Sequence, residues 1–154
     1  EAISFRKKVR KSGKSFVLTN GCFDLLHCGH AYSLQEASKY GDHLWVAMNS
    51  DASVRKLKGT ERPIVPEDQR AYLLNSLSCV SGVTLFQNER LTQEILALEP
   101  DVYVKASDYT EDSINAEEKE ALLSVNATLQ FVPFLPGNST SSLIKRIQSQ
   151  PNKG

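Results

Sequence analysis

The chain has 154 residues, with eighteen basic and eighteen acidic side chains that give a formal net charge of zero. This length suits one domain with its own core, and the balanced charge excludes recognition of a nucleic acid or a membrane surface through the overall field alone. Three cysteines in no paired spacing predict reduced thiols and a cytoplasmic location, and without an apolar run of about 18 residues we expect neither a membrane span nor a signal peptide.

The first fourteen residues are rich in Lys and Arg, and only Ile3, Phe5 and Val9 offer an apolar face. Because no aromatic interleaving follows these charges, a short solvated helix or lead-in is favoured over a nucleic-acid-binding patch. We therefore predict a basic lead-in at residues 1–14, one domain at residues 15–148 and a tail at residues 149–154.

From residue 15 onward, short β-rich runs alternate with helical runs. The predicted strands are residues 15–19, 43–49, 83–86, 101–105 and 128–134. The predicted helices are residues 30–41, 51–58, 66–80, 91–99, 115–124 and 141–150. This alternation predicts a doubly wound α/β fold, with a mainly parallel sheet of about five strands and helices on both faces.

The segment that joins the first strand to the first helix of this pattern has an unusual composition. Asn20 and Gly21 signal a turn at the carboxyl edge of the sheet, where open α/β folds bind ligands. Gly29 lies at the expected helix start, where free N–H groups and the helix dipole attract phosphate. His27 and His30 are three residues apart, so both rings can face one bound anion. Capping or surface histidines explain the spacing equally well, whereas a zinc site would need further ligands that the sequence does not supply.

These residues resemble a known family. "GCFDLLHCGH" is similar to the HxGH signature of the nucleotidyltransferase superfamily, which includes the cytidylyltransferases. "NGCFDLLHCGH", "GDHLWVAMNSDASVRKLKG", "RPIVPEDQR", "DVYVKASDY" and "STSSLIKRI" together look most like the D-glycero-β-D-manno-heptose 1-phosphate adenylyltransferase domain that makes the lipopolysaccharide precursor ADP-heptose in bacteria. The resemblance covers residues from about 15 to 148, with the motifs in the family's order.

The resemblance implies direct transfer of AMP from ATP to a sugar 1-phosphate, with Mg²⁺ accompanying the ATP and pyrophosphate leaving. The attacking phosphate is already an anion, so the site needs cations and N–H donors rather than a general base. The catalytic residues that it implies are His27, His30, Lys58 and Lys105. Members of the family often form dimers, and a fusion with a sugar kinase is another arrangement that the resemblance suggests.

Nucleotide binding is expected in the loop after the first strand, in the basic segment after residue 58 and at the start of the last helix. The implied residues are Asn20, Gly21, Cys22, Phe23, Gly29, Arg62, Ser139, Thr140 and Ser141. Hydroxyl side chains at the last helix start also predict a helix cap, which is compatible with phosphate binding. We interpret Cys22 as a small filler, since direct transfer uses no thiol nucleophile.

For a second group of polar residues, a structural role explains the residue about as well as a contact with the substrate does. These candidates for substrate contacts are Asp24, Asn49, Asp51, Arg70 and Asp108. Asp24 either forms a local turn or orients the site and helps to place Mg²⁺. Asp51 is first a helix cap, and Arg70 fits a surface ion pair equally well.

Two departures bear on the substrates. Ala106 and Ser107 stand where the heptose family has two glycines, which leaves the acceptor sugar open. Phe134 replaces an arginine of the glycerol-phosphate cytidylyltransferases, which favours ATP over CTP. The alternatives are a cytidylyltransferase for glycerol 3-phosphate or another alcohol phosphate, a catalytically silent nucleotide-binding module and, more remotely, an RNA-binding module that uses the basic lead-in.

Overall fold

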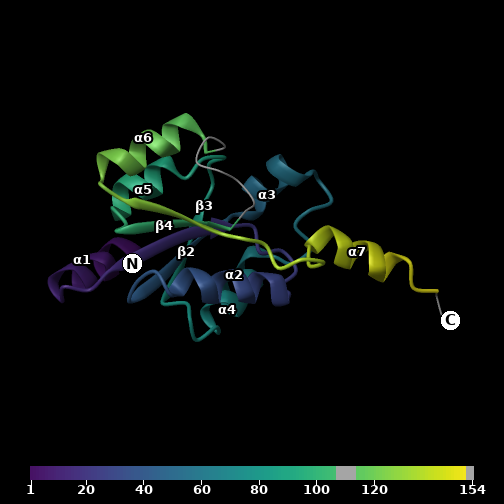
Figure 1. Ribbon diagram of the computed structural model, residues 1–154. Coiled ribbons are helices and arrows are strands. Elements are labelled where there is room, and N and C mark those ends of the chain that lie inside the picture. The colour runs from purple at the N-terminus through teal and green to yellow at the C-terminus, as the bar shows by residue number, and fades with distance from the viewer. Residues whose placement is uncertain (107–113, 152–154) are drawn as a thin grey trace.

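The computed structural model describes residues 1–106 and 114–151, and in these residues a single sheet forms the centre of the molecule (Figure 1). Its strands are β1 (Phe16–Gly21), β2 (His43–Asn49), β3 (Gly82–Phe86), β4 (Val102–Ala106) and β5 (Thr128–Val132). They lie in the order β3-β2-β1-β4-β5, and every neighbouring pair is parallel. The predicted sheet is thus confirmed, and all of its pairs are parallel.

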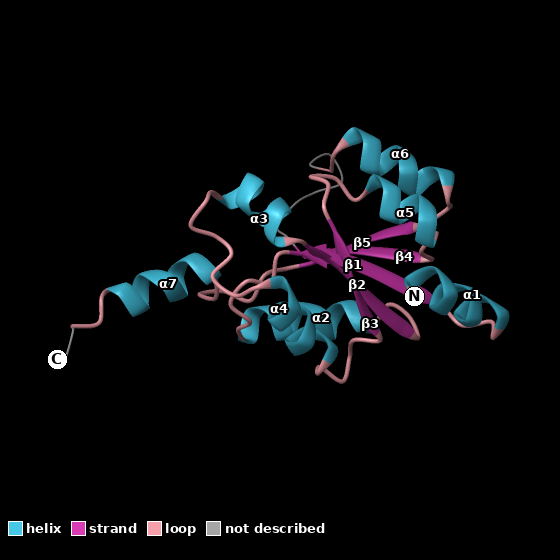
Figure 2. Ribbon diagram, turned by 180° about the vertical axis from the view of Figure 1, so that it is seen from behind, coloured by secondary structure: helices cyan, strands magenta, loops and turns pink. Residues whose placement is uncertain are grey.

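Helices connect and cover the strands (Figure 2). They are α1 (Ala2–Lys11), α2 (Cys28–Ser38), α3 (Asp51–Lys58), α4 (Glu67–Asn75), α5 (Thr92–Leu98), α6 (Ala116–Ser124) and α7 (Thr140–Gln148). In the described part of the chain, no helix combines the length and the apolar character that crossing a bilayer requires.

Each face of the sheet has its own apolar core, because successive strand residues point to opposite faces. On one face, Phe16, Leu18 and Tyr103 pack with residues of α1, α5 and α6. On the other, Val17 and Val104 pack with residues of α2 and α4. Helices therefore cover both faces, and the predicted doubly wound α/β fold is confirmed.

The strand order places a topological switch point between β1 and β4. The chain runs from β1 outward to β2 and β3 on one side, and then returns to β4 and β5 on the other. Crossovers of opposite direction leave a crevice at the carboxyl ends of these central strands, which is where such sheets bind ligands. The loop after β1 and Lys105 near the end of β4 both lie at this edge.

Within the first fourteen residues Ala2–Lys11 form α1, but the prediction of a merely solvated helix is wrong. Val9 is buried against the core, and the Arg6 side chain is buried as well, with an exposed fraction of 5% for the residue. Arg6 donates to the carbonyls of Leu98 and Glu99 and pairs with Asp101 at 2.9 Å. Because Val9, with Phe5 beside it, and the well-bonded Arg6 face the sheet, α1 is packed onto the fold despite its basic composition.

Candidate functional site

The loop after β1 is shaped by close contacts between its own residues. The Tyr103 hydroxyl donates to Asn20 Oδ1 at 2.8 Å, which ties the end of β1 to β4. Phe23 adopts a left-handed backbone with φ of 50°, which few residues with a side chain adopt. A Cβ at Gly21 would lie 2.8 Å from the Phe23 ring, so only glycine lets this ring turn back over the loop.

His27 and His30 lie side by side at the start of α2. Their rings stack with centroids 3.9 Å apart and planes 22° apart. His27 Nδ1 accepts from the Gly29 N–H at 3.1 Å, and His30 Nδ1 accepts from the His27 backbone N–H at 3.4 Å. Since an acceptor nitrogen carries no proton, these bonds assign the proton of each neutral ring to Nε2. The capping role predicted as one alternative therefore holds for His27, and among the described residues its Nε2–H has no acceptor and can serve as a donor.

Both histidines are electrically neutral near pH 7. Burial lowers the pKa of His30 to about 4, helped by the nearby charge of His27 and outweighing the opposite effects of Leu25 and Asp24. Burial also lowers the pKa of His27. The Phe23 ring contacts His30 edge-on, with centroids 5.3 Å apart, and adds to this apolar surrounding. His27 therefore offers an N–H donor rather than a fixed positive charge before an anion arrives.

Gly29 is required by the protein's own packing. A Cβ there would lie 2.9 Å from His27 Cε1 and 3.0 Å from the Cβ of Asn138. The sequence motif predicts that this glycine lets a ligand approach the backbone, but the structure gives another reason. Gly29 lets the His27 ring and the segment before α7 come together over the helix start.

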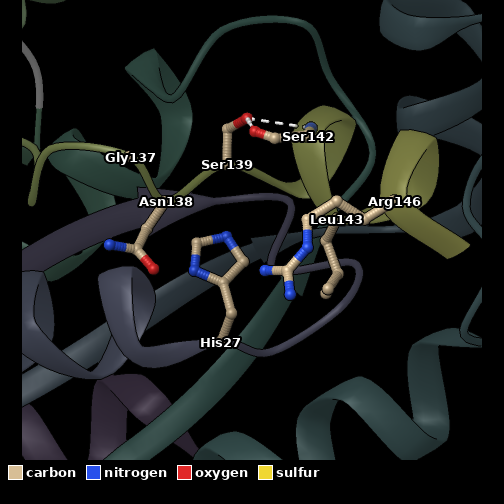
Figure 3. A pocket seen from close by; sticks show the side chains of 7 residues that line it. All are labelled: His27, Gly137, Asn138, Ser139, Ser142, Leu143 and Arg146. Atoms are coloured by element: carbon tan, nitrogen blue, oxygen red, sulfur yellow. Dashed lines mark hydrogen bonds between the residues drawn. The ribbon is translucent and has the colours of Figure 1, made fainter.

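A pocket opens between the start of α2 and the start of α7 (Figure 3). Its lining residues are His27, Gly137, Asn138, Ser139, Ser142, Leu143 and Arg146. The guanidinium group of Arg146 extends toward the His27 ring. The pocket holds about 50 Å³, well below the roughly 300–1,000 Å³ of most small-molecule sites. It suits a phosphoryl group rather than a whole nucleotide.

The start of α7 confirms the predicted cap, and the pocket beside it is lined by two residues outside the predicted set. Ser139 Oγ accepts from the Ser142 N–H at 3.0 Å, as a helix cap does. The sequence motif points to the consecutive residues Ser139, Thr140 and Ser141, of which Ser139 lines the pocket. The pocket is also lined by Ser142 and Arg146, which are absent from the predicted set. The i, i+3, i+4, i+7 period of a helix, counted from Ser139, would have found them.

The exposed Cys28 thiol links the two sides of the pocket. It donates to Asn138 Oδ1 at 2.9 Å, so the first residue of α2 is bonded to the segment that leads into α7. The other cysteine of this loop, Cys22, has a pKa raised by burial, despite the lowering charges of Lys58, Arg70 and Arg62. Cys22 thus stays a thiol near pH 7, which agrees with its interpretation as a filler.

Arg70 is buried and bonds several segments at once, so the prediction of a surface ion pair is wrong. It is 1% exposed, and its guanidinium donates to the carbonyls of Cys22, Asn49 and Val65. It also pairs with the Asp51 carboxylate at 2.6 Å. Arg70 therefore joins the ends of β1 and β2 to the starts of α3 and α4. Its donors are used within the protein, so we assign it to positioning the loop.

Asn49 and Asp51 are also occupied within the fold. Asn49 Nδ2 donates to Ser53 Oγ at 2.9 Å, and its Oδ1 accepts from the Cys22 thiol. The expectation that Asp51 caps α3 is wrong, because Ser50 is the N-cap and accepts from the Ser53 N–H at 3.2 Å. Asp51 is the first helical residue, where a carboxylate is also favourable.

Asp24 clamps the segment that follows α3. Its carboxylate accepts from the Arg62 guanidinium and from the backbone N–H groups of Ile64 and Val65. Burial raises the pKa of Asp24, but these hydrogen bonds outweigh it and hold the pKa below its usual value. Asp24 is 1% exposed, which argues against the predicted role in placing Mg²⁺. Among residues 1–106 and 114–151, no three His, Cys, Asp or Glu side chains gather as a metal site would require.

The remaining candidates lie around this edge of the sheet. Lys58 is exposed at the end of α3, and Arg62 is half-buried against Asp24. Lys105 lies near the end of β4, with Nζ 3.9 Å from Glu118 Oε2. Asp108 lies outside the described residues. The structure thus brings His27, His30, Gly29 and Ser139 together, while the roles of these residues in binding remain predictions.

Comparisons with known proteins agree on the protein family that this chain resembles. Residues 18–147 match the Cytidylyltransferase-like family model. Proteins named bifunctional protein HldE are 42% identical over 138 residues in Trichlorobacter lovleyi, 44% over 143 residues in Geotalea uraniireducens and 48% over 141 residues in Helicobacter pylori strain G27. These matches cover 90%, 93% and 90% of this chain but only 28%, 29% and 29% of the respective relatives.

A solved structure has the same fold. It is that of the lipopolysaccharide core biosynthesis protein from Thermoplasma volcanium, which is 26% identical and superimposes with a TM-score of 0.66. The match covers 82% of this chain and the whole of that one.

Proposed function

Because the chain belongs to the cytidylyltransferase-like family, we propose that it transfers AMP from ATP to a heptose 1-phosphate and releases pyrophosphate. One observation carries this proposal. His27, stacked on His30, faces the start of α7 across a phosphate-sized pocket. The motifs shared with the heptose 1-phosphate adenylyltransferases support the choice of acceptor, as does the likeness to a lipopolysaccharide core biosynthesis protein.

The reaction is an in-line displacement at phosphorus. A phosphate oxygen of the sugar forms a bond to the α-phosphorus of ATP, while the bond to the β-phosphate oxygen breaks and its electron pair leaves with pyrophosphate. The nucleophile is already an anion, so the protein need not remove a proton. It has to bring two mutually repelling phosphates together and stabilise the charge that gathers on the leaving group.

The described residues suit these tasks. His27 Nε2–H can donate to a phosphate oxygen at the N-terminus of α2, where the helix dipole also favours negative charge. The stacked His30 supports that ring from behind, and the resemblance gives it a contact of its own with the triphosphate. Arg146 and the N-terminus of α7 lie across the pocket. They are suited to hold the leaving pyrophosphate.

Mg²⁺ is expected to accompany ATP, because hard cations bridge phosphate oxygens. The described side chains do not fit a resident metal site, since they form no cluster of three metal-ligating groups. Asp24, the acidic residue of the signature loop, already accepts three hydrogen-bond donors. We therefore assign no step of the transfer to a metal held by the protein.

Pyrophosphate release in the presence of Mg²⁺ tests the proposal. ATP and CTP are each combined with heptose 1-phosphate, a hexose 1-phosphate and glycerol 3-phosphate. We expect release that requires ATP and heptose 1-phosphate and falls by about 10²- to 10³-fold in His30→Ala, the usual cost of losing one preorganised donor. Release that requires CTP and glycerol 3-phosphate would assign the chain to the alcohol-phosphate branch instead. ATP binding without release from any pair would indicate a nucleotide-binding module.

A further inference from the structure

A buried carboxylate lies beneath the carboxyl edge of the sheet, outside the pocket described above. Glu118, in the first turn of α6, is 5% exposed. Burying a carboxylate is costly unless hydrogen bonds or a cation compensate. Its Oε1 accepts from the Leu91 N–H at 2.9 Å, at the start of α5. One of the two carboxylate oxygens thus has a hydrogen-bond partner within the fold.

The other oxygen points to the end of β4. Oε2 lies 3.9 Å from Lys105 Nζ, beyond hydrogen-bond length but within the range of an ion pair. Three-quarters of the Lys105 side chain is covered, since its exposed fraction is 25%. Both partners are largely shielded from water, so their attraction is stronger than that of an exposed pair. The negative charge of Glu118 therefore holds the Lys105 ammonium in place.

This pair adjoins the loop that carries the histidines. Tyr103, two residues before Lys105 on the same face of β4, donates its hydroxyl to Asn20 at the end of β1. Burial, and then the charge of Glu118, raise the pKa of Tyr103 and keep the hydroxyl protonated as a donor. Tyr103 thus bonds this part of β4 to the end of β1, and the charge of Glu118 acts on its hydroxyl.

We propose that Glu118 is a positioning residue that holds the Lys105 ammonium at the carboxyl end of β4, in reach of a substrate phosphate. This inference rests on the proposed function, in which Lys105 contacts phosphate. Because Nζ lies 3.9 Å from Oε2, no hydrogen bond to Glu118 occupies the lysine donors, which can bond a phosphate oxygen. Glu118 itself touches no substrate and acts through the lysine.

The decisive variant is Glu118→Gln. Glutamine keeps the oxygen that accepts from Leu91 and has nearly the same shape, but it removes the charge that directs Lys105. We expect a loss of about 10- to 100-fold in kcat/KM for heptose 1-phosphate and ATP, the scale of a small misplacement of a catalytic group. The melting temperature should remain near that of the wild type. Glu120→Gln, an exposed change on the same helix, is the matched control and should leave both quantities unchanged.

A double-mutant cycle separates positioning from a general structural role. If Glu118 acts through Lys105, Glu118→Gln adds almost no further loss in a Lys105→Met background. Equal losses in the two backgrounds, or a Glu118→Gln variant as active as the wild type, would overturn the proposal.

Binding data separate this inference from the proposed function. If the wild type releases no pyrophosphate from any substrate pair, the proposed function fails, and calorimetric binding of ATP and of heptose 1-phosphate becomes the readout. Weaker binding in each single variant without further weakening in the double variant supports the positioning role. Binding unchanged by Glu118→Gln overturns it.

Discussion

The two sides of the pocket are built in opposite ways. The side that follows β1 and β2 is fixed by buried bonds, with Arg70 joining three carbonyls and a carboxylate and Asp24 holding the segment after Arg62. The other side is α7, which projects away from the sheet (Figure 1) and in which no residue, over its fully described length, is buried. The side after β1 and β2 is fixed before a ligand binds. The α7 side has no buried residue to hold it against the fold.

The sequence of α7 accounts for this difference. Ile147 is 59% exposed, and the helix begins after Gly137, whose φ of 78° suits a glycine turn. Without a buried face, a helix of this length is only marginally stable by itself. We therefore expect substitutions on the fixed side to affect folding and substitutions on the α7 side to affect ligand binding and catalysis.

The largest expected effect is the loss of Arg70. Arg70→Met leaves Asp51 and the carbonyls of Cys22 and Asn49 without their partner. Removing one member of a buried charged network typically costs about 3–5 kcal/mol. Urea unfolding should show this decrease in the free energy of unfolding. A variant as stable as the wild type would show that the fixed side is not held by Arg70.

Acid should also weaken the fixed side, through His30. Its pKa is about 4 in the folded protein against an ordinary value of 6.5. Between these values the unfolded chain binds a proton that the folded chain does not, so this contribution to stability is fully present above pH 6.5 and is lost as the pH falls toward 4.

His30→Gln tests this dependence and keeps an oxygen that can accept from the His27 N–H. Urea unfolding of both proteins at about pH 7 and about pH 5 should show a smaller loss on acidification in the variant. Equal losses in the two proteins would mean that His30 does not carry the effect.

On the α7 side, Arg146→Met should change activity without changing stability. Arg146 is exposed, so the free energy of unfolding should shift by no more than about 0.5 kcal/mol. A charged donor to phosphate is worth about 1.5–3 kcal/mol, so kcat/KM should fall by roughly 10-fold or more. Lys145→Met, the neighbouring exposed change on the same helix, is the control. Equal activities in the two variants would remove Arg146 from the site.

The smallest effect is expected at the cap of α7. Ser139→Ala removes the oxygen that accepts from the Ser142 N–H and should cost the helix about 0.5–2 kcal/mol. Because α7 is barely packed, hydrogen exchange of its amides should increase while the global unfolding transition stays in place. A clear fall in the global transition would instead show that α7 is coupled to the rest of the fold.

The sequence predicts the fold well and the site partly, for physical reasons. Alternating strands and helices leave periodic traces along the chain, and the spacing of His27 and His30 already implies that their rings can meet. The buried role of Arg70 escapes prediction because the carbonyls that it joins come from segments far apart in sequence, which no local pattern reveals. The position of Arg146 in the pocket lining follows from the helical period counted from Ser139, not from the run of consecutive hydroxyls in the motif.

The His27 ring has a consequence for how such a chain can change over evolutionary time. Nδ1 of this ring caps the N-terminus of α2, and the His27 ring also lines the pocket. A substitution that removes the chemistry also frays the helix unless the new side chain can cap it. Asn, Ser or Asp at this position would still cap the helix but would lack the imidazole N–H that reaches the pocket. These are therefore the replacements by which an active lineage would most easily give rise to a silent binding protein.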